Sequence, residues 1–139
     1  MEFSGELFYP GGISSSFYCS FLTEHQQWAN ISGTKGNLQL NDFVLPYFGN
    51  EVAFDVSNSV FDFVGCNFNT ERHVRRVAVS EYAGSHATAQ ETNLYRNFAD
   101  LVLSGQPDRK WGQIALNTQK VMEACWASAQ ADSKPVEFG

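Results

Sequence analysis

The chain has 139 residues, a formal net charge of -6, and an aromatic set of twelve Phe, five Tyr and three Trp. This length suits one domain with its own hydrophobic core. The acidic balance argues against binding nucleic acid or an anionic membrane surface, because both need a basic surface. No apolar run approaches the roughly 20 residues of a membrane helix, and the first residues lack the basic and apolar regions of a signal peptide.

Cysteine usage gives an expectation for the compartment. Cys19, Cys66 and Cys125 are an odd number of thiols at wide spacing, which is not the pattern of a disulfide framework. We therefore expect a reducing compartment, the cytoplasm. The opening residues read as the middle of a strand, so we also expect residues 1–139 to be one domain from the C-terminal part of a longer, two-domain chain.

The first part of the chain, from Glu2 to about Tyr82, alternates apolar and polar residues with a period of two. This period indicates antiparallel strands, and turn residues such as Pro10-Gly11-Gly12 separate the runs. The expected strands are residues 2–9, 13–21, 28–32, 37–40, 51–57, 59–65 and 73–82.

The later part has the 3.6-residue period of helices. Leu94, Phe98, Leu101 and Val102 mark one helix face, which Thr88 or Ser85 caps and Gly105 with Pro107 ends. A second helix is expected over 111–129 and a short last strand over 135–138. Strands grouped before helices predict an α+β fold, a large open antiparallel sheet with helices on one face.

That layering leaves one sheet face without a covering helix. Several expected strands carry large side chains on both faces, as with Phe8 beside Tyr9 and Phe17 beside Tyr18. An uncovered apolar face of this size exceeds what monomers usually expose. We therefore expect a homodimer through the sheet face.

Motifs for catalysis, cofactors and metals do not occur. The eleven glycines contain no G-x-G-x-x-G, no G-x-S-x-G elbow is found, and the three histidines lack metal-site spacing. The Gly33-Thr34-Lys35-Gly36 loop fits a hairpin turn better than a phosphate site, because no helix follows it. The basic run Arg72–Arg76 fits a solvated edge strand, with an anion site as the alternative.

An ordered set of motifs over nearly the whole chain resembles the glucose-fructose oxidoreductase, inositol dehydrogenase and MocA family. The hairpin resembles the family pattern I-x-G-x-x-G-x-L-x-L-x-D, and later segments resemble its penultimate helix, closing helix and last strand. The matching segments are Ile31–Asp42, Gln90–Asn93, Asn97–Asp100, Ser104–Asp108, Val121–Ala129 and Pro135–Phe138.

The resemblance implies the C-terminal domain of an NAD(P)-dependent oxidoreductase of sugars, cyclitols or related polyols, with the fold of the glyceraldehyde-3-phosphate dehydrogenase C-terminal domain. A Rossmann domain precedes it in the family and supplies the Gly-rich cofactor loop, a Glu-Lys-Pro segment and a catalytic His in an Asp-x-x-x-His helix. None of these is in the chain, so no catalytic, cofactor or metal residue is assigned and the chain alone is expected to be inactive. In relatives the segment entering the penultimate helix lies near the substrate, which implies substrate contacts by His86, Gln90, Glu91 and Asn93.

Two readings without catalysis stay open. A stand-alone ligand-binding module would enclose a pocket with converging polar groups. A purely structural interaction domain would have lost its chemistry altogether. For Gln90 and Glu91 the alternative to substrate contact is a plain helix start, where acidic residues are favoured.

Overall fold

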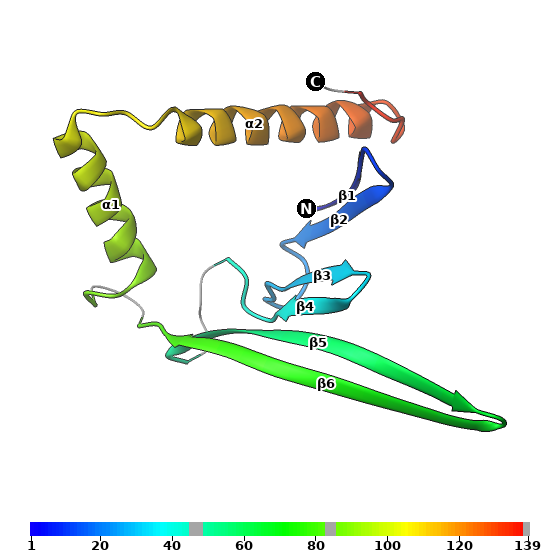
Figure 1. Ribbon diagram of the computed structural model, residues 1–139. Coiled ribbons are helices and arrows are strands. Elements are labelled where there is room, and N and C mark those ends of the chain that lie inside the picture. Colours follow the sequence, from blue (N-terminus) through cyan, green and yellow to red (C-terminus); the bar gives the residue numbers. More distant parts are fainter. Residues whose placement is uncertain (45–48, 83–85, 138–139) are drawn as a thin grey trace. The chain divides into compact units, whose positions relative to one another are not determined.

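The computed structural model describes residues 1–44, 49–82 and 86–137 as an α+β protein, which confirms the expected fold class (Figure 1). Strands come first along the chain and helices follow. The elements are β1 (Glu2–Tyr9), β2 (Ile13–Ser20), β3 (Ala29–Gly33), β4 (Gly36–Leu40), β5 (Glu51–Val64), β6 (Asn67–Ser80), α1 (Gln90–Ser104) and α2 (Arg109–Gln130). Neither α1 nor α2 combines the length and the hydropathy that crossing a bilayer requires.

The antiparallel strands form two sheets within the described residues, where the sequence predicted one large sheet. Strands β1 and β2 pair as a hairpin, and the four-stranded sheet has the order β3-β4-β5-β6. The sheets fall in two compact units, one made of residues 1–24 and those from 101 onward, the other of His25–Asp100. Next to the β3–β4 hairpin, a single isolated bridge joins Gln27, which precedes β3, to Asp42, which follows β4.

Several sequence predictions differ from the structure, among them the start of β6, which is Asn67 and not residue 73. The two strands expected on either side of Asn58 are one strand, β5, because Asn58 pairs in register with His73 of β6. The turn comes at Gly65, whose φ of 62° suits glycine. The expected last strand is wrong for residues 135–137, which are not in a strand, and Phe138 lies outside the described residues.

The segment after α2 is held to the helix itself. The Ser133 backbone N–H donates to the Ser128 carbonyl, and the Ser128 hydroxyl donates to the Lys134 carbonyl, at 2.9 and 2.7 Å. Pro135 follows and has no N–H to give to a strand ladder. These bonds hold Ser133 and Lys134 to the last turn of α2, immediately before the residues that were expected to form a strand.

Cross-strand register sorts the four-stranded sheet into two unlike faces, because directly opposed residues point to the same side. The polar face is defined by two rows across β3 to β6, Asn30–Gln39–Asp55–Arg76 and Ser32–Asn37–Ser57–Val74. The apolar face is defined by the rows Ala29–Leu40–Phe54–Val77 and Ile31–Leu38–Val56–Arg75. The period of two seen in the sequence therefore becomes a physical separation of hydrogen-bonding from hydrophobic side chains.

Strands β5 and β6 continue beyond β4 as a two-stranded ribbon, which can be followed in Figure 1. Along this ribbon, the side that carries the polar face becomes aromatic. Phe61 stacks on Phe63 with ring centroids 6.5 Å apart, and Phe63 meets Phe68 edge-on at 5.4 Å. These rings are exposed, at 63% for Phe61 and Phe63 and 76% for Phe68. We call Phe61, Phe63 and Phe68 the aromatic tip.

In the other unit the β1–β2 hairpin and α2 contribute to one apolar groove. Phe3 and Phe17 stack across the hairpin with centroids 6.0 Å apart. Asp108 is the N-cap of helix α2, and its carboxylate accepts from the Lys110 N–H at 2.9 Å. The groove is lined by Phe3, Leu7, Tyr9, Phe17, Cys19, Thr118, Val121, Met122 and Cys125.

The β3–β4 turn generates a prediction about its two glycines. A Cβ added to Gly36, where φ is 155°, would lie 2.5 Å from the Ser57 carbonyl oxygen of β5, whereas one added to Gly33 would meet nothing nearer than 3.6 Å. Gly36→Ala should therefore lower the free energy of unfolding by about 1–3 kcal/mol, the usual range for forced backbone strain.

The measurement is urea unfolding followed by circular dichroism, with Gly33→Ala as the matched control in the same turn. Equal stabilities for the two variants would contradict the close approach of β4 to β5 at Gly36.

Candidate functional site

The predicted substrate residues lie at the junction between β6 and α1, in the unit formed by His25–Asp100. We define the β6–α1 junction as Glu81, Tyr82 and residues 86–96. Its anchor is Ala89, which is fully buried while its neighbours are exposed. Ala89 donates its N–H to the His86 carbonyl and accepts from the Asn93 N–H, each at 3.0 Å, so it ties the loop to the first turn of α1.

Side chains of α1 hold the loop that precedes the helix. Asn93 donates through Nδ2 to the Thr88 carbonyl at 3.2 Å, and its Oδ1 accepts from Arg96 at 2.7 Å. Arg96 also donates to the Ala87 carbonyl at 3.2 Å. Both ends of the Asn93 amide are thus used within the junction, so the structure places this residue as a positioning group for the loop.

Glu81 caps helix α1 from the end of β6. Its Oε1 accepts from the Gln90 backbone N–H at 2.7 Å, satisfying one of the donors that a helix start leaves unpaired. The negative charge also suits the positive end of the helix dipole. Of the two caps expected from the sequence, Thr88 uses its hydroxyl on His86 instead, and Ser85 lies outside the described residues.

His86 is held from two directions. Its ring centroid lies 4.5 Å from that of Tyr82, with the planes tilted by 41°. Its Nδ1 lies 2.9 Å from the Thr88 hydroxyl oxygen and accepts from the Thr88 N–H at 3.3 Å. The imidazole is therefore fixed in place and orientation although it is exposed to solvent.

Gln90 and Glu91 lie in the first turn of α1 with exposed side chains. The four predicted residues thus fall on one short, internally bonded segment, but in different roles. Asn93 bonds inward, whereas Gln90 and Glu91 leave their side chains at the surface beside His86 in the chain.

Sequence reasoning missed several members of the junction. Arg96 follows Asn93 by three residues, a spacing at which helical side chains meet, so that pair was detectable. The Glu81 cap and the Tyr82–His86 contact join residues across a loop, and no periodicity in the sequence marks them. Their positions depend on where β6 ends.

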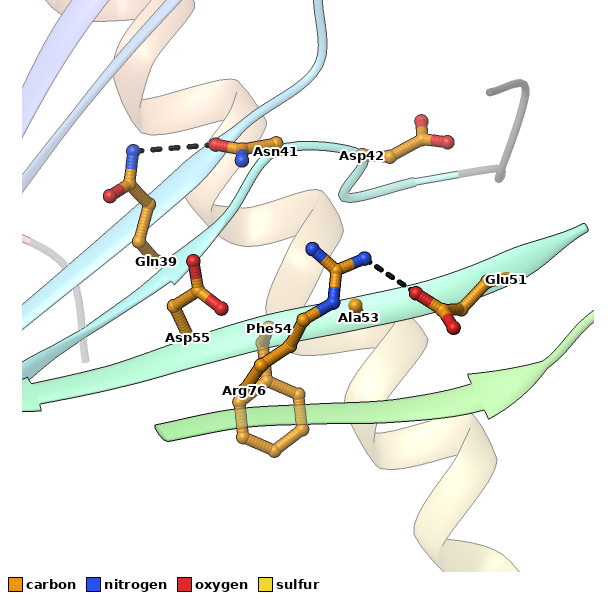
Figure 2. A pocket seen from close by; sticks show the side chains of 8 residues that line it. All are labelled: Gln39, Asn41, Asp42, Glu51, Ala53, Phe54, Asp55 and Arg76. Carbon is orange, nitrogen blue, oxygen red and sulfur yellow. Dashed lines mark hydrogen bonds and ion pairs between the residues drawn. The ribbon is translucent and has the colours of Figure 1, made fainter. Parts of the chain in front are cut away.

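A second polar region is a small hollow of about 160 Å³ on the polar face of the four-stranded sheet (Figure 2). Its lining is rich in carboxylates and amides: Gln39, Asn41, Asp42, Glu51, Ala53, Phe54, Asp55 and Arg76. Figure 2 shows the Arg76 guanidinium directed toward the Glu51 carboxylate, to which it is bonded. That hydrogen bond, reinforced by the Glu51 charge, raises the pKa of Arg76.

The same hollow has features of a solvated surface. Gln39 donates a hydrogen bond to Asn41 at 3.3 Å, and Arg76 forms an ion pair with Glu51. The polar groups of the hollow therefore bond largely to one another. Both partners of the ion pair are about half exposed or more, at 62% for Arg76 and 48% for Glu51. Exposed pairs of this kind contribute little stability.

The basic side chains of β6 point to opposite faces of the sheet, because side chains alternate along a strand. Arg72 and Arg76 point to the polar face, while His73 and Arg75 point to the opposite side. His73 lies 3.4 Å from the Glu71 carboxylate on its own side. The four basic side chains therefore do not converge on one anion, and the structure favours the solvated edge strand over the anion site.

Two further findings bear on function. Among residues 1–44, 49–82 and 86–137, no three His, Cys, Asp or Glu side chains gather as metal ligands would. No model of a known protein family matches the chain. What the protein does is therefore inferred from its own side chains and from the motifs that they form.

The Glu81 cap leads to a stability prediction. Glu81→Gln removes the charge at the helix start and should lower the free energy of unfolding by about 0.3–1 kcal/mol, the range for an acid near a helix N-terminus. Circular dichroism during urea unfolding measures the effect.

Glu6→Gln is the matched control, because it makes the same change at an exposed carboxylate that lies on a strand, β1, and not at a helix start. If Glu6→Gln destabilised the protein as much as Glu81→Gln, the charge at the start of α1 would not be the interaction that holds the junction.

Proposed function

We propose that this chain is the substrate-side and assembly domain of an NAD(P)-dependent oxidoreductase that acts on a sugar, cyclitol or related polyol. Its fold would be that of the glyceraldehyde-3-phosphate dehydrogenase C-terminal domain. The observation that carries the proposal is the β6–α1 junction, where an internally bonded segment presents His86, Gln90 and Glu91 at the surface. Such a segment suits recognition rather than chemistry.

The β3–β4 hairpin supports the resemblance on physical grounds. The pattern I-x-G-x-x-G places glycine at residue 36, where a Cβ would clash with the Ser57 carbonyl oxygen at 2.5 Å. The hairpin packs against β5 only with a bare backbone at that point. The motif is therefore tied to a sheet contact and not to turn composition alone.

The exposed groups of the junction match the chemistry of a polyol. Hydroxyl groups both donate and accept hydrogen bonds, and an amide, a carboxylate and an imidazole offer both kinds of partner. Oxidising an alcohol also needs a positioned base and a nicotinamide held against the reacting carbon. In this proposal a preceding Rossmann domain supplies both, and the chain alone is inactive.

The β5–β6 ribbon supports the assembly role. A two-stranded ribbon is only marginally stable by itself in water. This one nevertheless carries the aromatic tip, whose three rings are more than half exposed. A second copy of the chain covering that sheet face would remove these rings from water, and we assign the homodimer contact to it.

Self-association should therefore depend on the aromatic tip. The double substitution Phe63→Ser with Phe68→Ser removes two adjoining rings and should weaken the dimer at least tenfold, since burying each ring is worth about 1.5–3 kcal/mol. Sedimentation equilibrium of the intact chain measures the dissociation constant.

Phe8→Ser is the control, because Phe8 is as exposed as Phe68, at 76%, but belongs to the β1–β2 hairpin. A monomeric wild-type chain, or equal dimerisation of the double variant, would contradict the assembly role.

The proposal also predicts how the chain responds to nucleotides. A ligand at 100 times its dissociation constant adds about 2.7 kcal/mol to the stability of the protein that binds it. Because the chain lacks a Gly-rich cofactor loop, NAD and NADP should leave its unfolding temperature unchanged in a thermal-shift titration. A rise that grows with the concentration of either nucleotide would contradict the division of labour between two domains.

A further inference from the structure

We propose that His86 recognises its ligand as a hydrogen-bond donor through Nε2–H, and that the group it meets is a neutral hydroxyl oxygen. This inference rests on the proposed function and adds to it a direction for one hydrogen bond. It also implies that His86 does not accept the proton from the alcohol.

The direction of this hydrogen bond follows from the contacts of Nδ1, which lies on the side of the ring that faces Thr88. The Thr88 backbone N–H can only donate, and it points at Nδ1 from 3.3 Å. The Thr88 hydroxyl lies 2.9 Å from the same nitrogen. In a neutral imidazole one nitrogen carries the hydrogen and the other accepts. Since Nδ1 must accept from Thr88, the hydrogen lies on Nε2, at the far side of the ring.

The surroundings of the imidazole ring hinder its flip about the Cβ–Cγ bond. Tyr82 contacts it at a centroid distance of 4.5 Å, and the His86 carbonyl is bonded to the Ala89 N–H at 3.0 Å. Ala89 is fully buried, so the backbone on which the imidazole stands is fixed. A flipped ring would place a carbon opposite the Thr88 N–H and leave that donor without its partner.

Neighbouring charges select the kind of acceptor. The start of α1, which would otherwise attract an anion, is already occupied by the Glu81 carboxylate. Glu91 adds a second negative charge in the same turn, and the Arg96 guanidinium bonds inward to the Asn93 side chain and the Ala87 carbonyl. A phosphate or carboxylate bound at the junction would be repelled by these two carboxylates, whereas a neutral hydroxyl group would not.

The same geometry keeps His86 from acting as a base. The lone pair of the neutral ring is on Nδ1 and is directed at Thr88, so it faces away from any ligand at Nε2. His86 is thus a specificity residue. The proton acceptor for alcohol oxidation then belongs to another part of the enzyme.

The tautomer is tested directly on the wild-type chain. A long-range proton–nitrogen correlation spectrum recorded at about pH 8 should show protonated Nε2 and unprotonated Nδ1 for His86. Thr88→Val, which removes the hydroxyl, should shift population toward the other tautomer. Protonation at Nδ1 in the wild-type chain would overturn the inference and leave the proposed function untouched.

The ligand is tested by titrating the chain with myo-inositol and, separately, with inorganic phosphate, while following the His86 resonances. His86→Asn keeps an acceptor near the Nδ1 position but removes the outward donor. It should weaken myo-inositol binding roughly three- to tenfold, as expected for one neutral hydrogen bond. His73→Asn, the same change at an exposed histidine of β6, should leave binding unchanged.

The outcomes separate the two proposals. Myo-inositol binding that His86→Asn leaves intact would overturn the donor role alone. Tighter binding of phosphate than of myo-inositol at His86 would overturn the neutral acceptor. A chain with the Nε2–H tautomer that binds no myo-inositol at all would count against the polyol function itself.

Discussion

The continuous antiparallel register between β5 and β6 is the constraint on which the rest of the His25–Asp100 unit depends. Fourteen residues of each strand pair without interruption, from Glu51 with Ser80 to Val64 with Asn67. Because opposed residues share a side, this single ladder decides which side chains form the polar face and which form the apolar one. It also carries the aromatic tip away from β4.

The end of the same ladder sets the geometry of the candidate site. β6 ends at Ser80, and the next residue, Glu81, reaches the first turn of α1 with its carboxylate. A shift of the register by one residue would turn Glu81 to the other side of the sheet. The junction would then lose its cap, and Tyr82 would no longer lie against His86. The placement of Glu81 and Tyr82 at the junction is in this sense a consequence of strand pairing far from it.

The fold class and most elements could be predicted from the sequence, because they depend on local periodicity. The alternation in β1 to β4 and the helical spacing of Leu94 and Phe98 carry that information in neighbouring residues. The break expected at Asn58 was wrong, since polar residues in mid-strand resemble a turn until a partner strand continues past them. The split into two sheets was missed for the same reason, because pairing between distant segments leaves no local mark.

The candidate site shows a similar division. His86, Gln90, Glu91 and Asn93 could be singled out by their place before a helix, and the structure brings them onto one segment. Their separate roles depend on hydrogen-bond partners that only the folded chain reveals. Asn93 looked like a ligand group and bonds inward to Thr88 and Arg96, whereas Thr88 looked like a cap and instead orients His86.

In the proposed function, the sheet with its exposed aromatic tip would be one half of an assembly, and the β6–α1 junction would be one half of a binding site. The most direct test of that account is the genomic coding sequence immediately upstream of the codon for Met1. The account predicts an open reading frame of roughly 150–200 further residues with a strand, a G-x-G-x-x-G loop and a helix, the size and pattern of a dinucleotide-binding domain. A stop codon directly upstream of Met1 would contradict it.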